Sequence, residues 1–469
     1  MLFLLFRKTK NVFAFLIFIA LVFWAGAGIF IYGQGVEKEI ASIYYTIEFP
    51  DTELLKKALK KDRSIILDSF EDIAEEFISD KTDFLQVNLS EMKVSLYKMG
   101  LLIKEVPIVT KGKVDNWGGS AVGLYRILSG NKASYSNTSD IYMPYALHYY
   151  GKYYIHGIPY YHGGGKLDST FSGGCLRLSD EDAQSIYKTA DLSMPVLVID
   201  KKKDHYDYSK EDLTEFPKLS AESYLIADLD SNYVLAEKDS SQQFPIASLA
   251  KLMTALVVAE NVNLERSILI TQKMLDDGYG ITEELELGKR FRIVELFYPL
   301  LIESSNDTAE ALSYFLGKEK TIRLMNEKAI NILMEQTKFT DPSGFDAENV
   351  STAKDLFYLS RYIFNNRSPI FDITKKKKVL SFGGNISFDI EKLWNKNVFI
   401  IDPTFIGGKT GYIPEAKNTA VFLFKFYDEE GAERNLAFIL LKSENIKTDT
   451  QKTYLWLLKN YFKLQEYEI

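Results

Sequence analysis

The order of apolar and polar residues divides the chain into several parts, of which the first is a long apolar run. Residues 11–32 contain no charged side chain, and a helix of about 20 apolar residues is long enough to cross a bilayer. Arg7, Lys8 and Lys10 precede this run, so the positive-inside rule predicts a single-pass anchor with a cytoplasmic N-terminus. The sequence Ala25-Gly26-Ala27 resembles a signal-peptide cleavage site, but the apolar run continues beyond it, which favours an uncleaved anchor.

Residues 33–83 have the spacing of an amphipathic helix. Lysines and acids separate apolar residues that recur at helical intervals, namely Leu54, Leu55, Ala58, Ile65, Ile66 and Phe70. The repeat does not persist over several heptads, as a coiled coil would require. This part of the chain is therefore predicted to be a helical stalk.

Between residues 84 and 200 the pattern changes to the alternation of short strands. A polar turn between two apolar runs predicts a hairpin, and glycine-rich turns separate the later runs. Strands are predicted at 85–89, 94–97, 101–108, 124–127 and 153–156, followed by a helix capped by Ser179. This density of strands predicts a mainly-β domain, either a sandwich or a barrel.

Residues 201–218 are rich in charge and predict a linker to a second domain, 219–469. In this domain strands and helices both occur. Strands are predicted at 223–227, 233–236 and 435–441, and helices from Ser248 and over 322–334 and 450–464. The second domain is therefore predicted to have an α/β fold.

Composition limits the functions that this chain can have. Its 469 residues suit two or three domains, and 46% apolar residues exclude wholesale disorder. A net charge of -8 argues against nucleic acid as a partner, because there is no basic excess to displace counterions. We expect neither a metal nor a cofactor. The single cysteine cannot form an internal disulfide, so its thiol is free, pairs with another chain or is kept for chemistry.

That cysteine, Cys175, follows Ser172-Gly173-Gly174 and precedes Arg177. A thiol is a good nucleophile only as a thiolate, which needs a base or a positive field nearby. His156, on the strand predicted before it, is a candidate base, and the amides of the glycine turn are candidate donors to an oxyanion. The residue types alone leave open the alternative of a buried structural thiol.

The stretch around Cys175 resembles the L,D-transpeptidase catalytic domain of peptidoglycan synthesis. The resemblance is carried by His156-Gly157 and by Ser172, Gly174, Cys175, Leu176 and Arg177, with support from Met143-Pro144-Tyr145 and 123–127. It implies that Cys175 attacks the carbonyl before D-Ala in a tetrapeptide stem, with His156 as base. Gly174 and Arg177 are then expected to contact or orient substrate. Gly173 stands where the family usually has a second histidine.

Three triplets in the second domain occur in a fixed order: Ser248-x-x-Lys251, Ser304-x-Asn306 and Lys409-Thr410-Gly411. Together they are the set found in penicillin-binding proteins and serine β-lactamases. Their flanking residues resemble the low-molecular-mass D-alanyl-D-alanine carboxypeptidases over about 220–441, except that Ala416-Lys417 replaces the usual Ala-Gly.

This second resemblance implies a role for each motif residue. Ser248 would be the nucleophile, Lys251 its base and Ser304 a proton relay. Asn306 would bind the substrate amide, and Lys409 with Thr410 would hold the terminal carboxylate. The oxyanion would lie between the backbone N–H groups of Ser248 and Tyr412.

The sequence thus predicts a multidomain chain: an N-terminal transmembrane helix, a mainly-β L,D-transpeptidase-like domain and an α/β β-lactamase/transpeptidase-like domain. We expect a bifunctional enzyme of the bacterial cell membrane that acts on extracytoplasmic peptidoglycan stem peptides and is inhibited by β-lactams. Two alternatives remain. One is a serine β-lactamase, because Glu327-x-x-x-Asn331 imitates the deacylating motif of that class, although its apolar spacing favours an ordinary amphipathic helix. The other is a non-catalytic peptidoglycan-binding scaffold.

Overall fold

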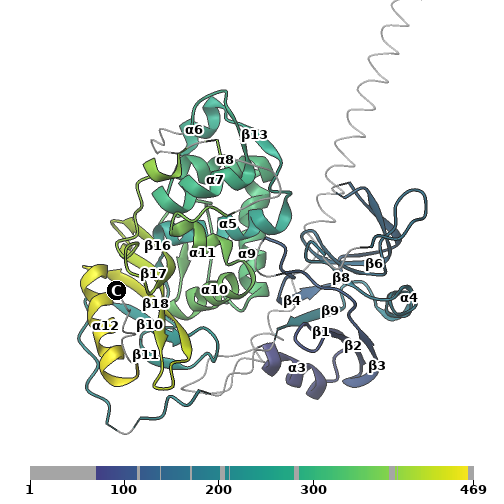
Figure 1. The fold of residues 1–469 in the computed structure, drawn as a ribbon, viewed down its shortest axis with the longest axis horizontal. Helices are drawn as coiled ribbons and strands as arrows, with labels where there is room; N and C mark the ends of the chain where they lie inside the picture. Colours follow the sequence, from purple (N-terminus) through teal and green to yellow (C-terminus); the bar gives the residue numbers. More distant parts are fainter. Residues whose placement is uncertain are drawn as a thin grey trace, which may run out of the picture. The chain divides into compact units, whose positions relative to one another are not determined.

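The computed structural model describes residues 70–113, 117–137, 139–168, 172–200, 206–210, 212–278, 285–379, 386–387 and 389–462 (Figure 1). Residues 61–469 belong to one compact unit. The predicted anchor, 11–32, and most of the predicted stalk lie outside the described residues. Within the described ranges no helix is long and apolar enough to span a bilayer. Of the predicted stalk, only the C-terminal end is described, and it contains the helix α3 (Phe70–Ser79).

The first domain contains a five-stranded sheet with the order β3-β2-β1-β9-β4. Its strands are β1 (Phe84–Asn88), β2 (Lys93–Lys98), β3 (Leu101–Pro107), β4 (Gly123–Arg126) and β9 (Pro195–Ile199). β1 and β2 form the predicted antiparallel hairpin, and β3 continues it. β9 returns parallel to β1 and antiparallel to β4, which completes the sheet.

A second sheet of this domain positions the cysteine. It has four strands in the order β5-β6-β7-β8: β5 (Ser129–Ser136), β6 (Ile141–Tyr150), β7 (Tyr153–His156) and β8 (Leu176–Arg177). β7 and β8 are parallel neighbours, with His156 opposite Arg177. After β8 comes α4 (Asp180–Thr189), and Ser179 caps it by accepting a hydrogen bond from the Asp182 amide, as predicted.

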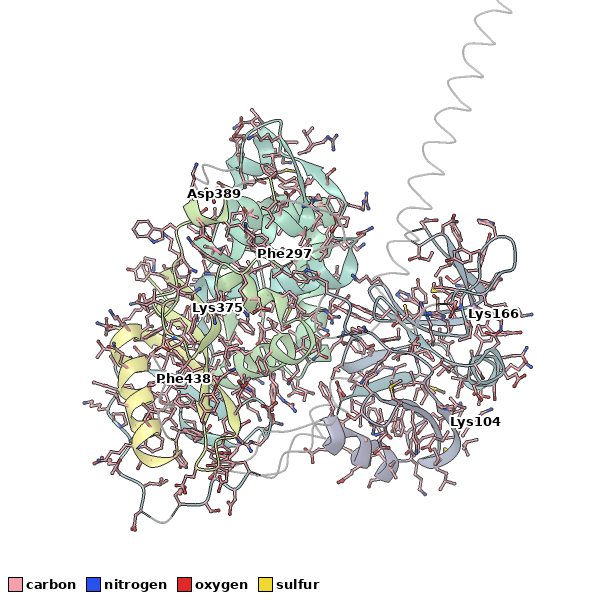
Figure 2. The ribbon with its side chains drawn as sticks, viewed as in Figure 1. Lys104, Lys166, Phe297, Lys375, Asp389 and Phe438 are labelled. Atoms are coloured by element: carbon pink, nitrogen blue, oxygen red, sulfur yellow. The ribbon has the colours of Figure 1, made fainter. Side chains whose placement is uncertain are left out.

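The second domain is built on an antiparallel sheet with the order β11-β10-β18-β17-β16. The strands are β10 (Ser223–Asp228), β11 (Val234–Lys238), β16 (Phe405–Ile413), β17 (Lys417–Tyr427) and β18 (Glu433–Ser443). Aromatic residues of β17 and β18, such as Phe422 and Phe438, pack with α12 (Ile446–Asn460) on one face (Figures 1 and 2). α10 (Ala353–Asn366) also contacts β10 and β18.

Helices between β11 and β16 carry most of the remaining chain. They are α5 (Ala250–Asn261), α6 (Gln272–Gly278), α7 (Ile293–Tyr298), α8 (Asn306–Leu316), α9 (Lys318–Asn331) and α11 (Pro369–Thr374). Three short helical turns lie among these helices: η1 (Ala247–Leu249), η2 (Pro299–Glu303) and η3 (Ile390–Lys392). There are also two pairs of short strands: β12 (Phe244–Pro245) pairs with β15 (Val350–Ser351), and β13 (Ser267–Leu269) pairs with β14 (Arg290–Arg292). Every residue of α5 from Ala250 to Glu260 is buried.

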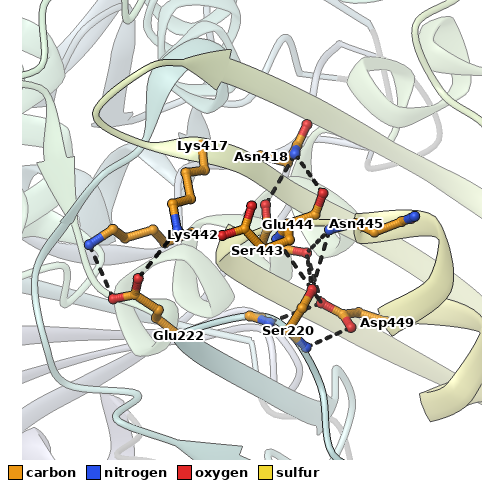
Figure 3. Close-up of polar contacts among 10 residues, drawn as sticks. Ser220, Glu222, Lys417, Asn418, Lys442, Ser443, Glu444, Asn445 and Asp449 are labelled. Atoms are coloured by element: carbon orange, nitrogen blue, oxygen red, sulfur yellow. Dashed lines mark hydrogen bonds and ion pairs between the residues drawn. The ribbon is translucent and has the colours of Figure 1, made fainter.

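Polar residues join the start of the second domain to its last helix (Figure 3). The Ser220 hydroxyl donates to the Asp449 carboxylate at 2.7 Å, and the Ala221 amide donates to the same carboxylate at 2.9 Å. Upstream, within the segment predicted to be a linker, Tyr208 is buried and donates a hydrogen bond to Asp228. These contacts attach the end of that segment to the sheet of the second domain.

Lys417 shows what the departure from Ala-Gly does to the backbone. Its φ is 49°, in the left-handed region that glycine enters without strain. A side chain in this region costs about 1–2 kcal/mol. The Lys417 ammonium makes an ion pair of 2.5 Å with Glu444 and lies 3.8 Å from Glu222 (Figure 3). The lysine is therefore accommodated at the edge of the fold, and β16 and β17 pair up to this turn.

Candidate active sites

The cysteine lies at the start of β8, beside β7. Parallel pairing sets Leu176 opposite Ile155, so the backbone of Cys175 lies level with Tyr154, two residues before His156 on β7. The cysteine is half-buried. Its Sγ donates to the carbonyl oxygen of Lys152 at 3.7 Å, at the start of β7.

The residues before Cys175 give its loop a fixed path. Gly174 has a φ of 114°, and a Cβ there would lie 2.2 Å from the ring of Tyr153, so only glycine fits. The Ser172 hydroxyl donates to the carbonyl oxygen of Cys175 at 2.6 Å. At Gly173 a Cβ would meet no atom within 4 Å. A Cβ at this position would therefore meet no clash with the described residues.

His156 is buried and has a defined tautomer. Its Nδ1 lies 2.6 Å from the Gly157 carbonyl oxygen, which can only accept, so Nδ1 carries the hydrogen and Nε2 the lone pair. Burial, with the charge of Arg177 nearby, lowers the pKa of His156 to about 4, despite the opposing hydrogen bond to Gly157. The imidazole is thus neutral at pH 7 and able to accept a proton.

The thiol is also neutral in this environment. Burial raises the pKa of Cys175, while the Tyr154 amide and the positive charges of Arg177 and Lys152 oppose that shift. The hydrogen bond of the thiol goes to Lys152 and that of the imidazole to Gly157. The resting pair is therefore a thiol and a neutral imidazole, and proton transfer must accompany attack on a substrate.

The serine site is formed where η1 leads into α5. The Lys251 ammonium donates to Ser248 Oγ at 2.9 Å, to Asn306 Oδ1 at 2.7 Å and to the Ser343 carbonyl at 2.7 Å. Burial lowers the pKa of Lys251 to about 7, although Asp341 and Glu310 oppose the shift. A lysine with this pKa is a suitable general base for the hydroxyl beside it.

The other two motifs meet at Lys409 on β16. Its ammonium donates to Ser304 Oγ at 2.8 Å and to the Thr410 carbonyl at 2.6 Å. Burial, together with the charges of Lys251 and Lys396, places the pKa of Lys409 well below its usual range. Ser304 has a φ of 65°, a strained conformation at the end of η2 that turns the chain into α8.

Gly411 brings β16 against the nucleophile turn. A Cβ at this position would lie 2.7 Å from the Ser248 amide nitrogen, so a side chain would separate the two segments. The close approach places the strand that carries Tyr412 beside the Ser248 N–H, as the predicted oxyanion site requires. The Tyr412 side chain itself is exposed.

Some residues of the serine site were not predicted from the sequence. The Ser343 carbonyl is a third acceptor for Lys251. The negative charges of Asp341 and Glu310 partly offset the lowering of the Lys251 pKa by burial. Glu327, in contrast, lies on α9 and pairs with Arg323 at 2.7 Å, which agrees with an ordinary helix residue.

Comparisons with known proteins match both regions. Residues 82–198 match the family model of the L,D-transpeptidase catalytic domain, and residues 210–424 match that of D-alanyl-D-alanine carboxypeptidase. A D-alanyl-D-alanine endopeptidase of Haemophilus influenzae is 35% identical over 210 residues, covering 44% of this chain and 70% of that protein. The chain belongs to the D-alanyl-D-alanine carboxypeptidase family.

A second relative agrees with this membership. A D-alanyl-D-alanine carboxypeptidase of Mycobacterium tuberculosis is 30% identical over 213 residues, covering 44% of this chain and 70% of that one. A solved D-alanyl-D-alanine carboxypeptidase structure from the same organism aligns with a TM-score of 0.46 at 26% identity, over 56% of this chain and 98% of that one. The two family matches show that the chain combines a serine carboxypeptidase domain with an L,D-transpeptidase catalytic domain.

Neither catalytic domain offers a metal site in the parts that the structure describes. Among those residues no group of three or more histidine, cysteine, aspartate or glutamate side chains could hold a metal ion.

The carboxypeptidase domain is expected to gain activity as the pH rises through about 7. Lys251 must be unprotonated to take the proton of Ser248, and burial lowers the pKa of Lys251 to about 7. Below that pH, kcat/KM for D-Ala release should fall about tenfold per pH unit. The profile is measured between about pH 5 and pH 9. A flat profile over that range would contradict Lys251 as the base.

Proposed function

We propose that this chain is a bifunctional peptidoglycan-remodelling enzyme anchored in the bacterial cell membrane by residues 11–32, with both catalytic domains outside the cytoplasm. One observation carries the proposal: a single chain contains two separate nucleophiles, each with a base close by in the fold. Lys251 Nζ lies 2.9 Å from Ser248 Oγ, and Cys175 lies beside β7, the strand that carries His156. The family matches and the names of the relatives support peptidoglycan stem peptides that end in D-Ala as the substrates.

In the carboxypeptidase half, Lys251 takes the proton of Ser248 as its oxygen attacks the carbonyl between the two D-Ala residues. The C–N bond breaks, the proton passes to the leaving amine, and free D-Ala departs. Ser304, held by Lys409, lies where it can relay that proton, and Lys409 with Thr410 can bind the terminal carboxylate. Water then hydrolyses the ester, and a tetrapeptide stem remains.

In the transpeptidase half, His156 Nε2 accepts the thiol proton while Cys175 Sγ attacks the carbonyl between the third residue and D-Ala. D-Ala leaves with the proton, and an acceptor amine then attacks the thioester. Arg177, buried beside the thiol, stabilises negative charge on sulfur. The product of the serine site is the donor of the cysteine site, and placing both on one chain raises the local concentration of that donor.

The test is a product analysis by mass spectrometry. The full chain is incubated with a pentapeptide stem and an amine acceptor such as glycine. We expect the tetrapeptide to appear first, followed by the tripeptide joined to the acceptor. Tetrapeptide that accumulates without further reaction would contradict the transpeptidase half. Release of D-Ala that resists penicillin would contradict the carboxypeptidase half.

A non-catalytic scaffold is the second candidate, because Gly173 replaces the usual histidine of the first site. Carbapenem labelling separates the two candidates. A catalytic Cys175 should form a stable adduct that is visible in the intact mass, whereas a structural thiol should not react. The membrane assignment is tested by fractionation of cells that produce the full chain and a form lacking residues 1–32.

A further inference from the structure

Glu260, at the C-terminal end of α5, is the centre of a buried cluster of charges. Its carboxylate pairs with Lys328 of α9 at 2.9 Å and with Arg367 at 2.8 Å, and all three side chains have 0% exposure. Tyr362 also donates to this carboxylate. Buried charges need such compensation, because removing each from water costs several kcal/mol.

Tyrosines of the transpeptidase domain complete this cluster. The Lys328 ammonium donates to Tyr125 Oη at 2.9 Å and lies 4.7 Å from the ring centre of Tyr150. Arg367 Nη2 donates to Tyr153 Oη at 2.5 Å. The two catalytic domains thus meet through charged groups of one domain and aromatic hydroxyls of the other.

Lys152, the residue before Tyr153, binds the last turn of α5. Its ammonium donates to the Ala259 carbonyl at 2.9 Å, and its amide donates to the Glu260 carbonyl at 3.4 Å. A cation is favoured at this end of a helix, where the carbonyl groups lack partners and the helix dipole is negative. Gly151 allows the approach, because a Cβ there would lie 2.7 Å from the Glu260 carbonyl.

The same two residues also hold the cysteine loop. The carbonyl of Lys152 accepts the hydrogen bond of Cys175 Sγ, and the ring of Tyr153 fills the space against Gly174. Each residue therefore has one end fixed by the carboxypeptidase domain and the other in contact with the thiol loop. Neither is a candidate to react with substrate.

We propose that α5 is a shared element of the two active sites, and that Lys152 and Tyr153 are positioning residues for Cys175. The N-terminal turn of α5 presents Lys251 to Ser248. The C-terminal turn of α5 binds Lys152, at the start of β7, whose carbonyl accepts the hydrogen bond of the thiol. α5 has 12 residues and is therefore about 18 Å long, so a single helix contacts both sites. The inference rests on the proposed role of Cys175 as nucleophile.

The experiment compares the acylation of Cys175 by a carbapenem in full-length variants that also carry Ser248→Ala, so that only the thiol can react. Lys152→Met keeps the length of the side chain and removes its hydrogen bonds to α5. We expect acylation to slow by at least about tenfold, because small displacements of a reacting group cost that much or more. D-Ala release, measured with Ser248 intact, should stay within about twofold.

Two control variants separate positioning from other effects. Lys152→Arg retains a cation for the α5 carbonyls and should restore most of the acylation rate. Lys166→Met removes an exposed lysine of the same domain that pairs with Asp180, and should change nothing (Figure 2). Iodoacetamide needs only an accessible thiolate, so its alkylation of Cys175 in Lys152→Met should slow only as far as the lost charge raises the thiol pKa, which is a smaller loss than that of acylation. Equal losses with both reagents would mean that Lys152 acts only through its charge, and would overturn the proposal.

Tyr153→Phe provides a second variant in case Lys152→Met does not fold. It keeps the ring against Gly174 and removes the hydroxyl that binds Arg367. Carbapenem acylation should slow in this variant too, by about threefold, with alkylation unchanged. If wild-type Cys175 reacts with the carbapenem and both variants react equally fast, the inference is wrong. If wild-type Cys175 does not react at all, the proposed function fails instead.

Discussion

Replacing Ser248 with alanine is expected to reduce D-Ala release by about 10⁴-fold or more while leaving Cys175 reactive. The hydroxyl is the hydrogen-bond partner of Lys251 at 2.9 Å, and no other hydroxyl in the described residues receives a bond from that ammonium. Without it, no ester intermediate can form. The measurement is D-Ala release from a pentapeptide stem, with carbapenem acylation of Cys175 followed in the same sample.

Two variants make this result specific. Ser241→Ala alters an exposed serine shortly before the motif and should release D-Ala at the wild-type rate. Cys175→Ala should give the mirror result, with D-Ala release intact and no transfer of the tetrapeptide to an acceptor. Residual release near the wild-type rate in Ser248→Ala would show that the nucleophile of the carboxypeptidase domain is a different residue.

Local patterns in the sequence predicted the parts of the fold that depend on neighbouring residues. The hairpin of β1 and β2 follows from alternation on either side of a polar turn, and the Ser179 cap from a hydroxyl before an acidic first turn. β5 and β6 were not predicted. β5 is largely polar, and β6 carries Pro144 within a run of tyrosines, so neither shows a clear period of two.

The same distinction holds for the active sites. The three motifs of the carboxypeptidase domain have a fixed order, so their residues could be named before the fold was known. The hydrogen-bond acceptor of Cys175 could not, because the carbonyl of Lys152 is a backbone group 23 residues away and its presence there depends on the pairing of β7 with β8. The sequence suggested His156 as the base, but it could not show that the Gly157 carbonyl holds Nδ1 of this imidazole.

Buried charges were the hardest feature to predict. Glu260 lies 68 residues before Lys328, which lies 39 residues before Arg367, and each is of a type that is usually exposed. Lys328 even belongs to the helix whose Glu327 was expected to be solvated, and Glu327 does remain near the surface. One position along a helix changes the direction of a side chain by about 100°. Apolar periodicity alone does not indicate which charged residue turns inward.

Replacing Glu260 with glutamine is expected to lower the free energy of unfolding by about 3–5 kcal/mol, because it leaves two buried cations without a carboxylate. The Glu260 carboxylate forms ion pairs with Lys328 at 2.9 Å and with Arg367 at 2.8 Å, and none of the three side chains is exposed to water. The cluster also joins the two domains through Tyr125 and Tyr153. The loss should therefore appear in probes of either domain. It is measured by denaturant titration, with tryptophan fluorescence and Cys175 accessibility as separate signals.

A matched surface variant and a double variant test this explanation. Glu348→Gln removes the partner of Lys338, and because both side chains are mostly exposed it should cost no more than about 1 kcal/mol. Adding Lys328→Met to Glu260→Gln removes one of the two unpaired cations, so the double variant should be more stable than Glu260→Gln alone. If the double variant were less stable by the sum of the two single losses, the destabilisation would come from lost packing. The unpaired charge would then not be its cause.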